Sequence, residues 1–593
     1  MADGQQNADE IVYTLIPQPG IKRDGTQLEG ENCSDGQWVR FQRGKAKKIG
    51  GYKRITSGLT GPVRKFILWS RKYLNSCTSF SSSGIETLLV DNNLIGNYIS
   101  NRTPSGFVAD ADNIWSVDTQ YDDAVGTAET IFVAHCSQSL SNIDDDRASK
   151  PYWALASSAS SQFVQITDAP AVSGGVFCIA PYTICYGSDG YVAWSDINQP
   201  QVWDTSAEPG DAGSDRVTGA KIVAGLPIRA GQLSALLWSL DSVIRMDYVG
   251  GQAIWRFSTV STQSSILAQN SVIEYDGTYF WIGVDRFLYF DTSVKELTND
   301  LNQNWFFDNL NYQYRQKVWA TKVPRYGEIW WFYPRGNATE CSHAIIFNIR
   351  SKTWYDIELA RSAGFYSQIR HYPTWVGSNV ELDTPIDNPL QVWTRVTVTA
   401  TCVRIGHGFA NGDIIHVSAS SSLGAITLGN KTLTVVDPDT FTFTCLNAGD
   451  ASGTLTFDRI DQTYGLYQHE IGNNAVVGDT ELAIKSYYTT QNFGLPTGGV
   501  ADSQQGSNRW TRLTRVEPDF IQQGDMTCTV LGYEFAQTTG EPEVSYTFSP
   551  TTGKIDTRDQ RRHILLKFES NVLDGFYEAG KVIIHTESGD NRS

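Results

Sequence analysis

Short aromatic strands alternating with polar turns recur through the first two thirds of the chain, and this repeat limits the possible folds more than any other feature. The clearest units begin at Phe66, Ile131, Val176, Ala235, Ser271 and Lys317. Successive starts lie 65, 45, 59, 36 and 46 residues apart, near the ~40–50 residues of a propeller blade. A few antiparallel strands cannot bury both of their faces alone, but radially packed sheets can. The repeat predicts an all-β chain with a β-propeller of about six blades; an array of β-sandwiches is the alternative, since the units are irregular.

The fifth and sixth units show how the strands follow from the residues. Asp276-Gly277 is a hairpin turn signal because this dipeptide accepts positive φ angles. The segment 279–283 after it alternates side chains between two faces, as a strand does. Gly327 marks the corresponding turn of the sixth unit, and 329–333 is the strand that follows. Each unit therefore predicts antiparallel hairpins.

Residues 391–460 have a different character. Aromatic residues become rare, and Thr alternates with apolar residues in a way that predicts four or five short strands. The aromatic-rich pattern resumes afterwards, so this segment is predicted to be a small β-barrel or sandwich inserted in a loop of the larger protein. His407 and His416 lie beside Gly/Asp turns, which favours a turn or surface role over metal binding.

The last part of the chain again predicts strands, among them TRLTRVEPDF, MTCTVLGYEF and HILLKFES, separated by turn residues. Arg561 and Arg562 precede the last of these. The pair is a candidate interface, and a solvated strand end is the alternative. The chain is thus divided into an N-terminal part, 1–62, a propeller, 63–390, an inserted module, 391–460, and a C-terminal β-rich part, 461–593.

The charge is uneven along the chain. The net charge is −17, with 13 Lys/Arg and 7 Asp/Glu in residues 1–72 (+6), which leaves 34 and 57 in the remainder (−23). An acidic body argues against a nucleic-acid grip, because phosphate contacts need a basic surface. It fits a surface past which DNA slides, or simple solubility. The basic segment from Arg40 to Lys72 is predicted either to dock on an acidic partner or to be a solvated edge strand protected by Lys.

Motifs with a known mechanism do not appear in the sequence. It has no GxxxxGK[ST], HExxH, CxxC or Gly-x-Ser-x-Gly pattern. We therefore expect no catalytic residues, no cofactor and no metal. The enzymatic alternative is a propeller glycosidase, which would use paired carboxylates and aromatic platforms. Ser188-Asp189-Gly190 lacks the spacing of a sialidase Asp box, and a structural turn is the simpler interpretation.

The nine Cys are odd in number and scattered, which predicts reduced, mostly buried thiols rather than a disulfide framework. The polar N-terminus lacks the pattern of a signal peptide. No apolar run approaches the ~20 residues that span a bilayer. We expect a protein made in a reducing compartment and not anchored in a membrane.

The N-terminal segment Ile16–Arg54 carries a series of motifs that resembles the opening of the tail nozzle proteins (tail tubular or tail hub proteins) of short-tailed bacteriophages, the podovirus type. The matching positions are Pro19, Gly20, Asp24, Trp38, Arg40, Phe41, Gly44, Ile49, Gly50, Gly51 and Tyr52. The resemblance continues through 276–291, 328–334, 346–356, 515–520, 553–562 and 589–592. It covers nearly the whole chain except 391–460. That segment is similar to a small β-domain inserted in many phage tail proteins.

The resemblance implies a virion structural protein. The nozzle is a ring, usually a homohexamer, below the portal and the head-to-tail adaptor. A β-propeller lies on the outside, and a β-rich platform is built from the sequence before and after it. Tail fibres or tailspikes attach around the ring, and DNA leaves through the channel without sequence-specific binding. Such a protein would be made in the host cytoplasm and end in the virion tail.

The residues chosen as a candidate assembly interface are Trp38, Arg40, Phe41 and Arg43, together with Arg561 and Arg562. Aromatic and Arg side chains dominate interface hot spots, so the first four could hold the N-terminal segment to the platform or the adaptor. Packing of a first strand within the chain is the alternative. The rival functions are a propeller glycosidase or depolymerase, and a glycan- or protein-binding propeller without an assembly role.

Overall fold

The computed structural model describes residues 10–589 apart from 27–28, 72–73, 91–95, 124–127, 139–147, 206–209, 229–232, 368–371, 379–390, 405–413, 423–424, 438, 461–462, 478–479, 495–509, 536–539 and 541. Strands dominate throughout, which confirms the all-β prediction. Within these residues, α1 (Gln303–Asn309) is the one α-helix. No described helix combines the length and apolar character that a membrane crossing requires. His407 and the final motif residues 590–592 lie outside the described residues.

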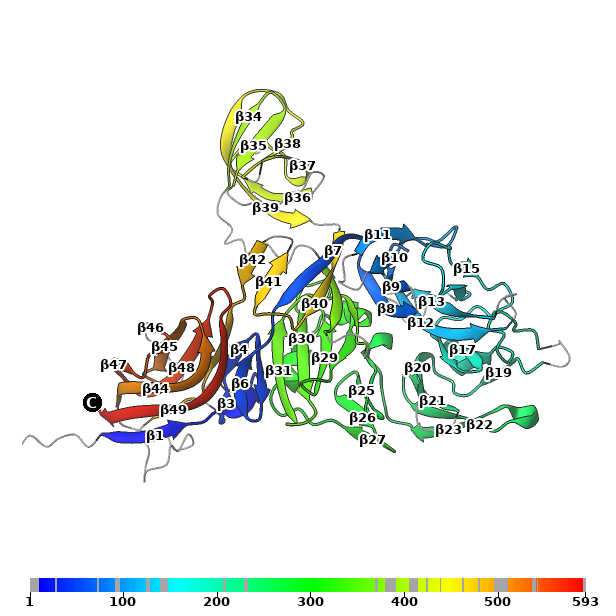
Figure 1. Cartoon of the computed structure of the whole chain (residues 1–593), viewed down its shortest axis with the longest axis horizontal. Coiled ribbons are helices and arrows are strands. Elements are labelled where there is room, and N and C mark those ends of the chain that lie inside the picture. Colours follow the sequence, from blue (N-terminus) through cyan, green and yellow to red (C-terminus); the bar gives the residue numbers. More distant parts are fainter. Residues whose placement is uncertain are drawn as a thin grey trace, which may run out of the picture.

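Six four-stranded antiparallel sheets follow one another from residue 63 to 358, each built from consecutive strands (Figure 1). Sheet 1 comprises β8 (Val63–Arg71), β9 (Leu74–Ser81), β10 (Ile85–Val90) and β11 (Gly96–Asn101). Sheet 2 comprises β12 (Asn113–Asp122), β13 (Glu129–Gln138), β14 (Tyr152–Leu155) and β15 (Val164–Gln165). Sheet 3 comprises β16 (Gly175–Ile179), β17 (Tyr182–Tyr186), β18 (Tyr191–Trp194) and β19 (Gly213–Arg216).

The next three sheets repeat this plan. Sheet 4 comprises β20 (Ile222–Ile228), β21 (Ser234–Ser239), β22 (Val243–Tyr248) and β23 (Trp255–Ser261). Sheet 5 comprises β24 (Ile273–Tyr275), β25 (Thr278–Ile282), β26 (Phe287–Phe290) and β27 (Val294–Glu296). Sheet 6 comprises β28 (Trp319–Val323), β29 (Glu328–Tyr333), β30 (His343–Asn348) and β31 (Thr353–Glu358). The turn between β24 and β25 has Asp276 at φ 49° and Gly277 at φ 81°, as the dipeptide predicts.

A seventh sheet joins distant parts of the chain. Its order is β32 (Ala363–Phe365), β33 (Thr374–Ser378), β40 (Thr463–His469), β7 (Tyr52–Thr60), β41 (Asn474–Val477) and β42 (Thr480–Ala483). Strand β7 immediately precedes sheet 1 in the sequence but pairs with β40. The expected boundaries at 62 and 460 therefore fall beside strands that belong together in one sheet.

Buried side chains connect each sheet to the next around a closed circuit. At each junction, buried residues of the two neighbouring sheets belong to one core cluster: Phe80 with Trp115, Val133 with Val176, Phe177 with Leu237, Trp238 with Trp281, Phe287 with Trp331, Trp330 with Trp375, and Val376 with Phe66. The first strands of neighbouring sheets also approach each other, as β8, β12, β16 and β20 do. These aromatic side chains bury large apolar areas on both faces of each sheet. The arrangement is consistent with a β-propeller.

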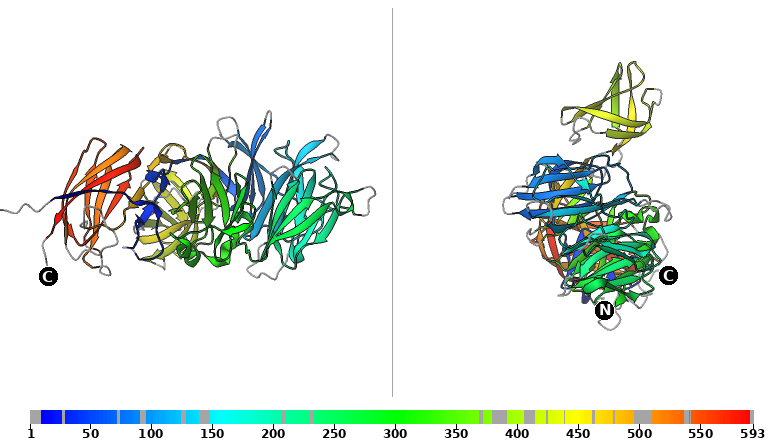
Figure 2. Two further views of the ribbon diagram at one scale, coloured as in Figure 1. Left: turned by 90° about the horizontal axis from the view of Figure 1, so that it is seen from below. Right: turned by 90° about the vertical axis from the view of Figure 1, so that its right-hand side faces the viewer.

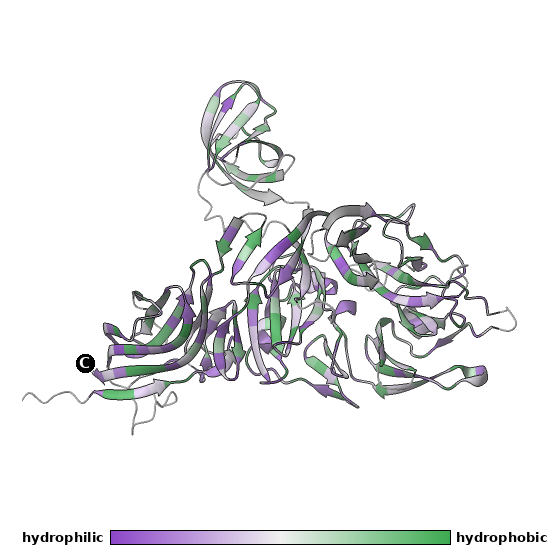
Figure 3. Cartoon of the chain, viewed as in Figure 1, coloured by the Kyte–Doolittle hydropathy of each residue, from purple (hydrophilic) through white to green (hydrophobic). Residues whose placement is uncertain are grey.

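The two ends of the chain form a separate pair of sheets, here called the terminal sandwich. One sheet contains β47 (Ile555–Arg561), β44 (Thr511–Gln523), β49 (Phe576–Ser588), β6 (Lys45–Lys48) and β5 (Val39–Gln42), with β1 (Ile11–Leu15) also on β49. The other contains β4 (Asp35–Gln37), β43 (Ser486–Thr489), β48 (His563–Ser570), β45 (Met526–Tyr533) and β46 (Val544–Phe548). Their inner faces share one core with sheet 6. Hydrophilic and hydrophobic residues alternate along these strands (Figure 3), because successive side chains point to opposite faces.

Residues 391–460 form a closed barrel, which lies apart from the rest of the chain (Figure 2). Its strands, in order around the barrel, are β34 (Gln391–Val396), β35 (Thr399–Val403), β38 (Thr440–Thr444), β37 (Gly429–Asp437), β36 (Ile414–Ser420) and β39 (Ala451–Ile460). It has its own core around Trp393 and Phe441. This is the segment for which the sequence predicted an inserted module.

Candidate assembly interface

The N-terminal motif lies where the terminal sandwich meets sheet 6. Strand β31, the last strand of that sheet, contacts β4, β5 and β2 (Gln18–Ile21), and β2 also pairs with β3 (Asn32–Cys33). The motif residues are therefore placed between two parts of the same chain. We refer to this region, residues 16–54 with the elements that contact them, as the seam.

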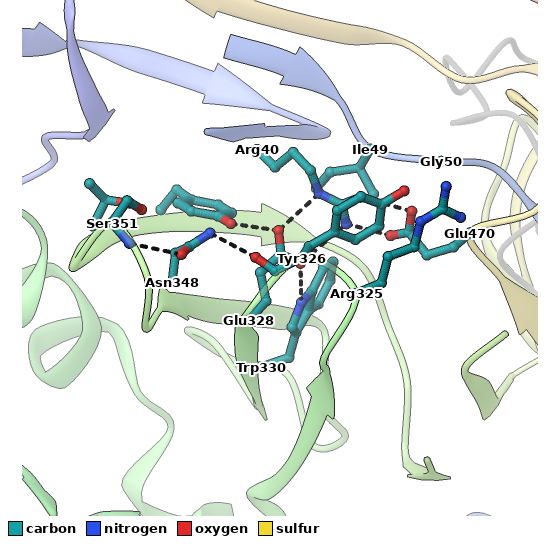
Figure 4. A network of polar contacts seen from close by, with 12 residues as sticks. Arg40, Ile49, Gly50, Arg325, Tyr326, Glu328, Trp330, Asn348, Ser351 and Glu470 are labelled. Carbon is teal, nitrogen blue, oxygen red and sulfur yellow. Dashed lines mark hydrogen bonds and ion pairs between the residues drawn. The ribbon is translucent and has the colours of Figure 1, made fainter. Parts of the chain in front are cut away.

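Arg40 is the central charged residue of the seam. Its guanidinium makes an ion pair with Glu328 of β29, with 2.9 Å between Nε and Oε1, and donates a hydrogen bond from Nη1 to Glu470 Oε2 at 2.8 Å. The guanidinium also stacks over Tyr326, 3.6 Å from the ring centroid. Figure 4 shows the two carboxylates approaching Arg40 from different segments. The exposed fractions of the Arg40, Glu328 and Glu470 side chains are only 1%, 0% and 4%.

Two further side chains donate hydrogen bonds to Glu328. Glu328 accepts from Trp330 Nε1 at 2.9 Å and from the Tyr355 hydroxyl at 2.7 Å. Burial raises the pKa of Glu328, and the charge of Arg40 partly opposes that rise. For Arg40, burial acts to lower the pKa, but Glu328 and Glu470 outweigh it and the net direction is upward. The guanidinium therefore stays charged, and its two carboxylates tie β5 to sheet 6 and to the end of β40.

Two aromatic residues flank Arg40 and are buried with it. Trp38 has φ 57° and donates a hydrogen bond from Nε1 to the Ile49 carbonyl at 3.1 Å. Phe41 lies edge-on to Tyr355, with ring centroids 5.7 Å apart. Both are less than one tenth exposed. Trp38 thus folds the β5–β6 hairpin on itself, while Phe41 fastens it to β31.

The Arg23-Asp24 dipeptide attaches the start of the motif to sheets 5 and 6. Arg23 pairs with Asp35 and with Asp356 of β31, the latter at 3.1 Å from Nε. Asp24 accepts the backbone N–H groups of Asn304 and Trp305 at 2.8 and 2.7 Å. These N–H groups open α1 and have no partner inside the helix. Burial raises the pKa of Asp356, with the charge of Arg23 opposing the rise.

The six residues chosen from the sequence divide into two groups. Trp38, Arg40, Phe41 and Arg561 are buried, and Arg561 donates from Nη2 to the Pro542 carbonyl at 2.7 Å. These four side chains pack within their own chain, as the alternative describes, and contact with another subunit stays a prediction. Arg43 is exposed at the β5–β6 turn, and Arg562 is half-buried over the exposed ring of Phe535. These two remain available as an interface.

Glu328 and Glu470 were missed in the sequence. Glu328 opens the aromatic strand EIWWFY, and an acidic residue in such a strand must find a partner because a lone buried carboxylate is costly. The acidic residue in an aromatic strand was visible in the sequence, but it does not identify its partner Arg40, which lies 288 residues away. Glu470 gave no comparable signal, since it follows the end of β40 in a turn.

The axis of the sheet circuit is the place to test the glycosidase alternative. Lys65 of β8 donates from Nζ to Asn270 Oδ1 at 3.1 Å, so a side chain of sheet 1 meets the short 3₁₀ helix η3 (Gln269–Ser271) before sheet 5. Gln269 bonds Ser137 of sheet 2 at 3.3 Å and the Tyr186 hydroxyl of sheet 3 at 3.5 Å. Burial lowers the pKa of Lys65, and Asp118 opposes this. Polar side chains from sheets 1, 2 and 3 thus meet those of η3.

The first strands of sheets 1–6 carry three carboxylates, and each is held within the chain. Asp118 accepts the Cys178 N–H at 2.9 Å, Asp122 accepts Gln201 Nε2 at 2.6 Å, and Glu274 pairs with Lys322 at 3.1 Å. Glycosidases need two carboxylates facing one sugar bond. In the described part of the chain, no group of three or more His, Cys, Asp or Glu side chains is placed to hold a metal ion. All nine Cys are free and buried.

No family model matches the chain, and no curated protein matches it. Solved structures with partial similarity include an ancestral GH74 enzyme (12% identity, 58% of this chain and 49% of that one, TM-score 0.34). Others are YCF48 bound to D1 peptide (10%, 56% and 94%, TM-score 0.31) and exo-β-1,3-galactanase from Phanerochaete chrysosporium (10%, 91% and 100%, TM-score 0.26). The chain spans about half the length of the first of these. At these TM-scores the similarities carry no argument about this chain.

Proposed function

We propose that the chain is the nozzle subunit of a short phage tail, a virion structural protein that closes into a ring and conducts DNA. The observation that carries this proposal is the seam. Motif residues on which the resemblance rests, including Asp24, Trp38, Arg40 and Phe41, bind the terminal sandwich to the sheet circuit. A subunit that closes a ring with one part and carries fibres with another needs these parts held in a fixed relation.

The finer architecture belongs to the same proposal. We take the seven sheets as seven blades, with β7 completing the last blade, in place of the six expected. The terminal sandwich, built from residues 11–48 and 486–588, would be the platform that forms the ring. The partners are further copies of the chain, the head-to-tail adaptor, tail fibres or tailspikes, and passing DNA. The protein would be made in the host cytoplasm, need no cofactor and have no enzymatic activity.

The charge distribution supports the conduit role. Residues 73–593 have a net charge of −23, from 34 Lys/Arg and 57 Asp/Glu. Like charges repel, so an acidic channel wall would keep DNA from sticking during ejection.

Negative-stain images of the purified chain, alone and mixed with the adaptor, test the proposal. A ring with a central channel is the expected result. Monomers that form no ring in either sample, at a concentration where the chain is folded, would contradict it. Arg43→Glu with Arg562→Glu should give fewer rings without unfolding the chain, because neither side chain is fully buried.

A glycan-acting propeller is the second candidate, favoured by the three first-strand carboxylates Asp118, Asp122 and Glu274. Release of reducing ends from capsular polysaccharide or peptidoglycan would identify it. Loss of that release in Asp118→Asn, with unchanged folding, would place the chemistry on the axis. If the wild-type chain releases no reducing ends, the glycan-acting candidate is excluded for these substrates.

A further inference from the structure

One face of the barrel consists of Val, Thr and Ser over three whole strands, β34, β35 and β38, and the adjoining parts of β39 (452–454) and β37 (432–436). Inward and outward residues alternate on these strands, and the exposed Asp437 at the end of β37 lies at the edge of the face, opposite Thr440. We call it the Thr/Val face. Its fourteen residues are Val392, Thr394, Val396, Thr399, Thr401, Val403, Thr432, Thr434, Val436, Thr440, Thr442, Thr444, Ser452 and Thr454. The four Val side chains are 62–65% exposed, so this face is not covered by the rest of the chain.

Hydroxyl groups lie in register across the Thr/Val face. Strand pairing places Ser452 opposite Thr394, Thr394 opposite Thr401, Thr401 opposite Thr442, and Thr442 opposite Thr434. Five hydroxyl-bearing residues thus form one transverse row. Neighbouring strands lie ~4.8 Å apart, and residues two apart on a strand are separated by ~6.6 Å. The result is a lattice of hydroxyl and methyl groups with two fixed spacings.

None of the fourteen residues of the Thr/Val face is charged, Asp437 lies at its edge, and the barrel as a whole is nearly neutral. Residues 391–460 contain four Lys/Arg and five Asp/Glu, a net of −1. The other residues then hold 43 and 59, a net of −16. A charged partner would gain nothing from this face. A cationic partner would be drawn to the acidic rest of the chain instead, and an anionic one finds no cation on this face, so the face favours an uncharged partner.

The lattice also limits the chemistry of that partner. Each Thr or Ser hydroxyl has one donor and two acceptor sites, and covering it without a hydrogen bond costs free energy. A partner must therefore present its own donors and acceptors repeatedly, beside apolar patches for the methyl groups. A neutral polysaccharide has both. A protein partner fits less well, because the face lacks the Trp, Tyr and Arg residues that anchor protein interfaces.

Symmetry argues against a second copy as the occupant within a ring. Two identical faces meet only about a two-fold axis, whereas neighbours in a cyclic ring use two different surfaces. In Figure 1 the barrel stands clear of the body, with β36 and β39 on the side nearer to it and β34, β35 and β38 farther away. These last three strands carry most of the Thr/Val face.

We propose that the Thr/Val face is a binding site for neutral, hydroxyl-rich polysaccharide. This goes beyond the nozzle function and rests on it only for avidity: several barrels on one ring would bind one polymer surface together, so a weak site suffices. A single chain would still bind through the same face. The site involves recognition only, and no bond is made or broken.

Affinity electrophoresis of the full chain tests the proposal, using gels that contain dextran, laminarin or galactomannan, with the anionic polymer alginate as a charge control. Retardation by at least one neutral polymer and not by alginate is expected. Thr401→Lys with Thr442→Lys places two charges in the central row and should weaken binding at least tenfold. Ala448→Lys is the matched control, since Ala448 is exposed on the barrel outside the face, and should bind like the wild type.

The outcomes separate this site from the nozzle function. Absence of retardation by all three neutral polymers, or equal retardation of the double Lys variant, overturns the proposal. Sedimentation velocity on the same samples identifies the other occupant: a wild-type dimer that the double Lys variant abolishes would show that the face binds a second copy, and would also overturn it. Negative-stain images of these samples report ring formation independently, so either idea can fail while the other stands.

Discussion

Arg40 and Glu328 lie 288 positions apart in the chain, yet their side chains meet at 2.9 Å with almost no exposure to solvent. Glu470 completes the network from a third segment. The network therefore forms only when three distant segments of the chain have folded together, and substitutions in it test the seam directly.

Arg40→Met is expected to destabilise the protein by ~3–5 kcal/mol, because it leaves two buried carboxylates without their cation. Unfolding in urea, followed by Trp fluorescence, measures the loss. Arg43→Met is the control, since Arg43 is exposed three residues away, and should stay within ~0.5 kcal/mol of the wild type. Equal stabilities of the two variants would refute a structural role for the network.

Gly51→Ala should destabilise the seam by ~1–3 kcal/mol through overpacking. A Cβ at Gly51 would lie 2.2 Å from the Asn474 carbonyl oxygen, beside the pairing of β7 with β41. Gly219→Ala is the matched control, because a Cβ there meets nothing within 4 Å. Thermal unfolding of both variants checks this; a normal melting temperature for Gly51→Ala would contradict the close approach.

Acid should weaken sheet 2 through His135. This side chain is buried, with Nε2 2.9 Å from the Val172 carbonyl oxygen, and burial lowers its pKa to about 4. Between pH ~4 and ~6.5 the unfolded chain binds a proton that the folded chain does not, so this group makes stability fall as the pH falls through that window, by up to ~1.4 kcal/mol per pH unit. His135→Gln should flatten the pH dependence of urea unfolding between pH 7.5 and 5, and an unchanged slope would exclude His135 as its source.

Trp375→Ala should cost ~3–5 kcal/mol, because it removes a buried ring from the junction of sheets 6 and 7. The Trp375 ring packs 5.1 Å from Trp330 and 5.3 Å from Phe332. Calorimetric unfolding measures the loss. Phe535→Ala, on a ring that is 52% exposed, is the control and should change stability by less than ~0.5 kcal/mol. A small effect at Trp375 would indicate that the circuit does not close through this junction.

Arg43→Glu with Arg562→Glu should leave unfolding unchanged and weaken self-association. These are the two candidate interface residues that reach the surface, and reversed charges there oppose the attraction that steers assembly. Sedimentation velocity across a concentration series provides the measurement. Unaltered association would remove both residues from the interface.

Local features of the fold could be predicted from the sequence, and long-range ones could not. Turn dipeptides such as Asp276-Gly277 and the alternation in 391–460 mark strands because both act over a few residues. No local pattern in the sequence predicts that β7 pairs with β40, because the two strands lie some 400 residues apart in the chain. In the candidate interface, the sequence marked Trp38, Arg40 and Phe41 by residue type, and the structure buries all three within the chain. Residue type alone does not distinguish a partner in another subunit from one in the same chain.

The barrel begins after β33 and ends before β40, and these two strands pair with each other from Thr374–Gln468 to Ser378–Tyr464. The whole module is thus carried in what would otherwise be the turn of a hairpin. Because the strands on either side are already in register, the module could be removed, replaced or acquired by a single genetic exchange without shifting any other strand. A lineage could change what this part of the protein recognises while its scaffold stays constant.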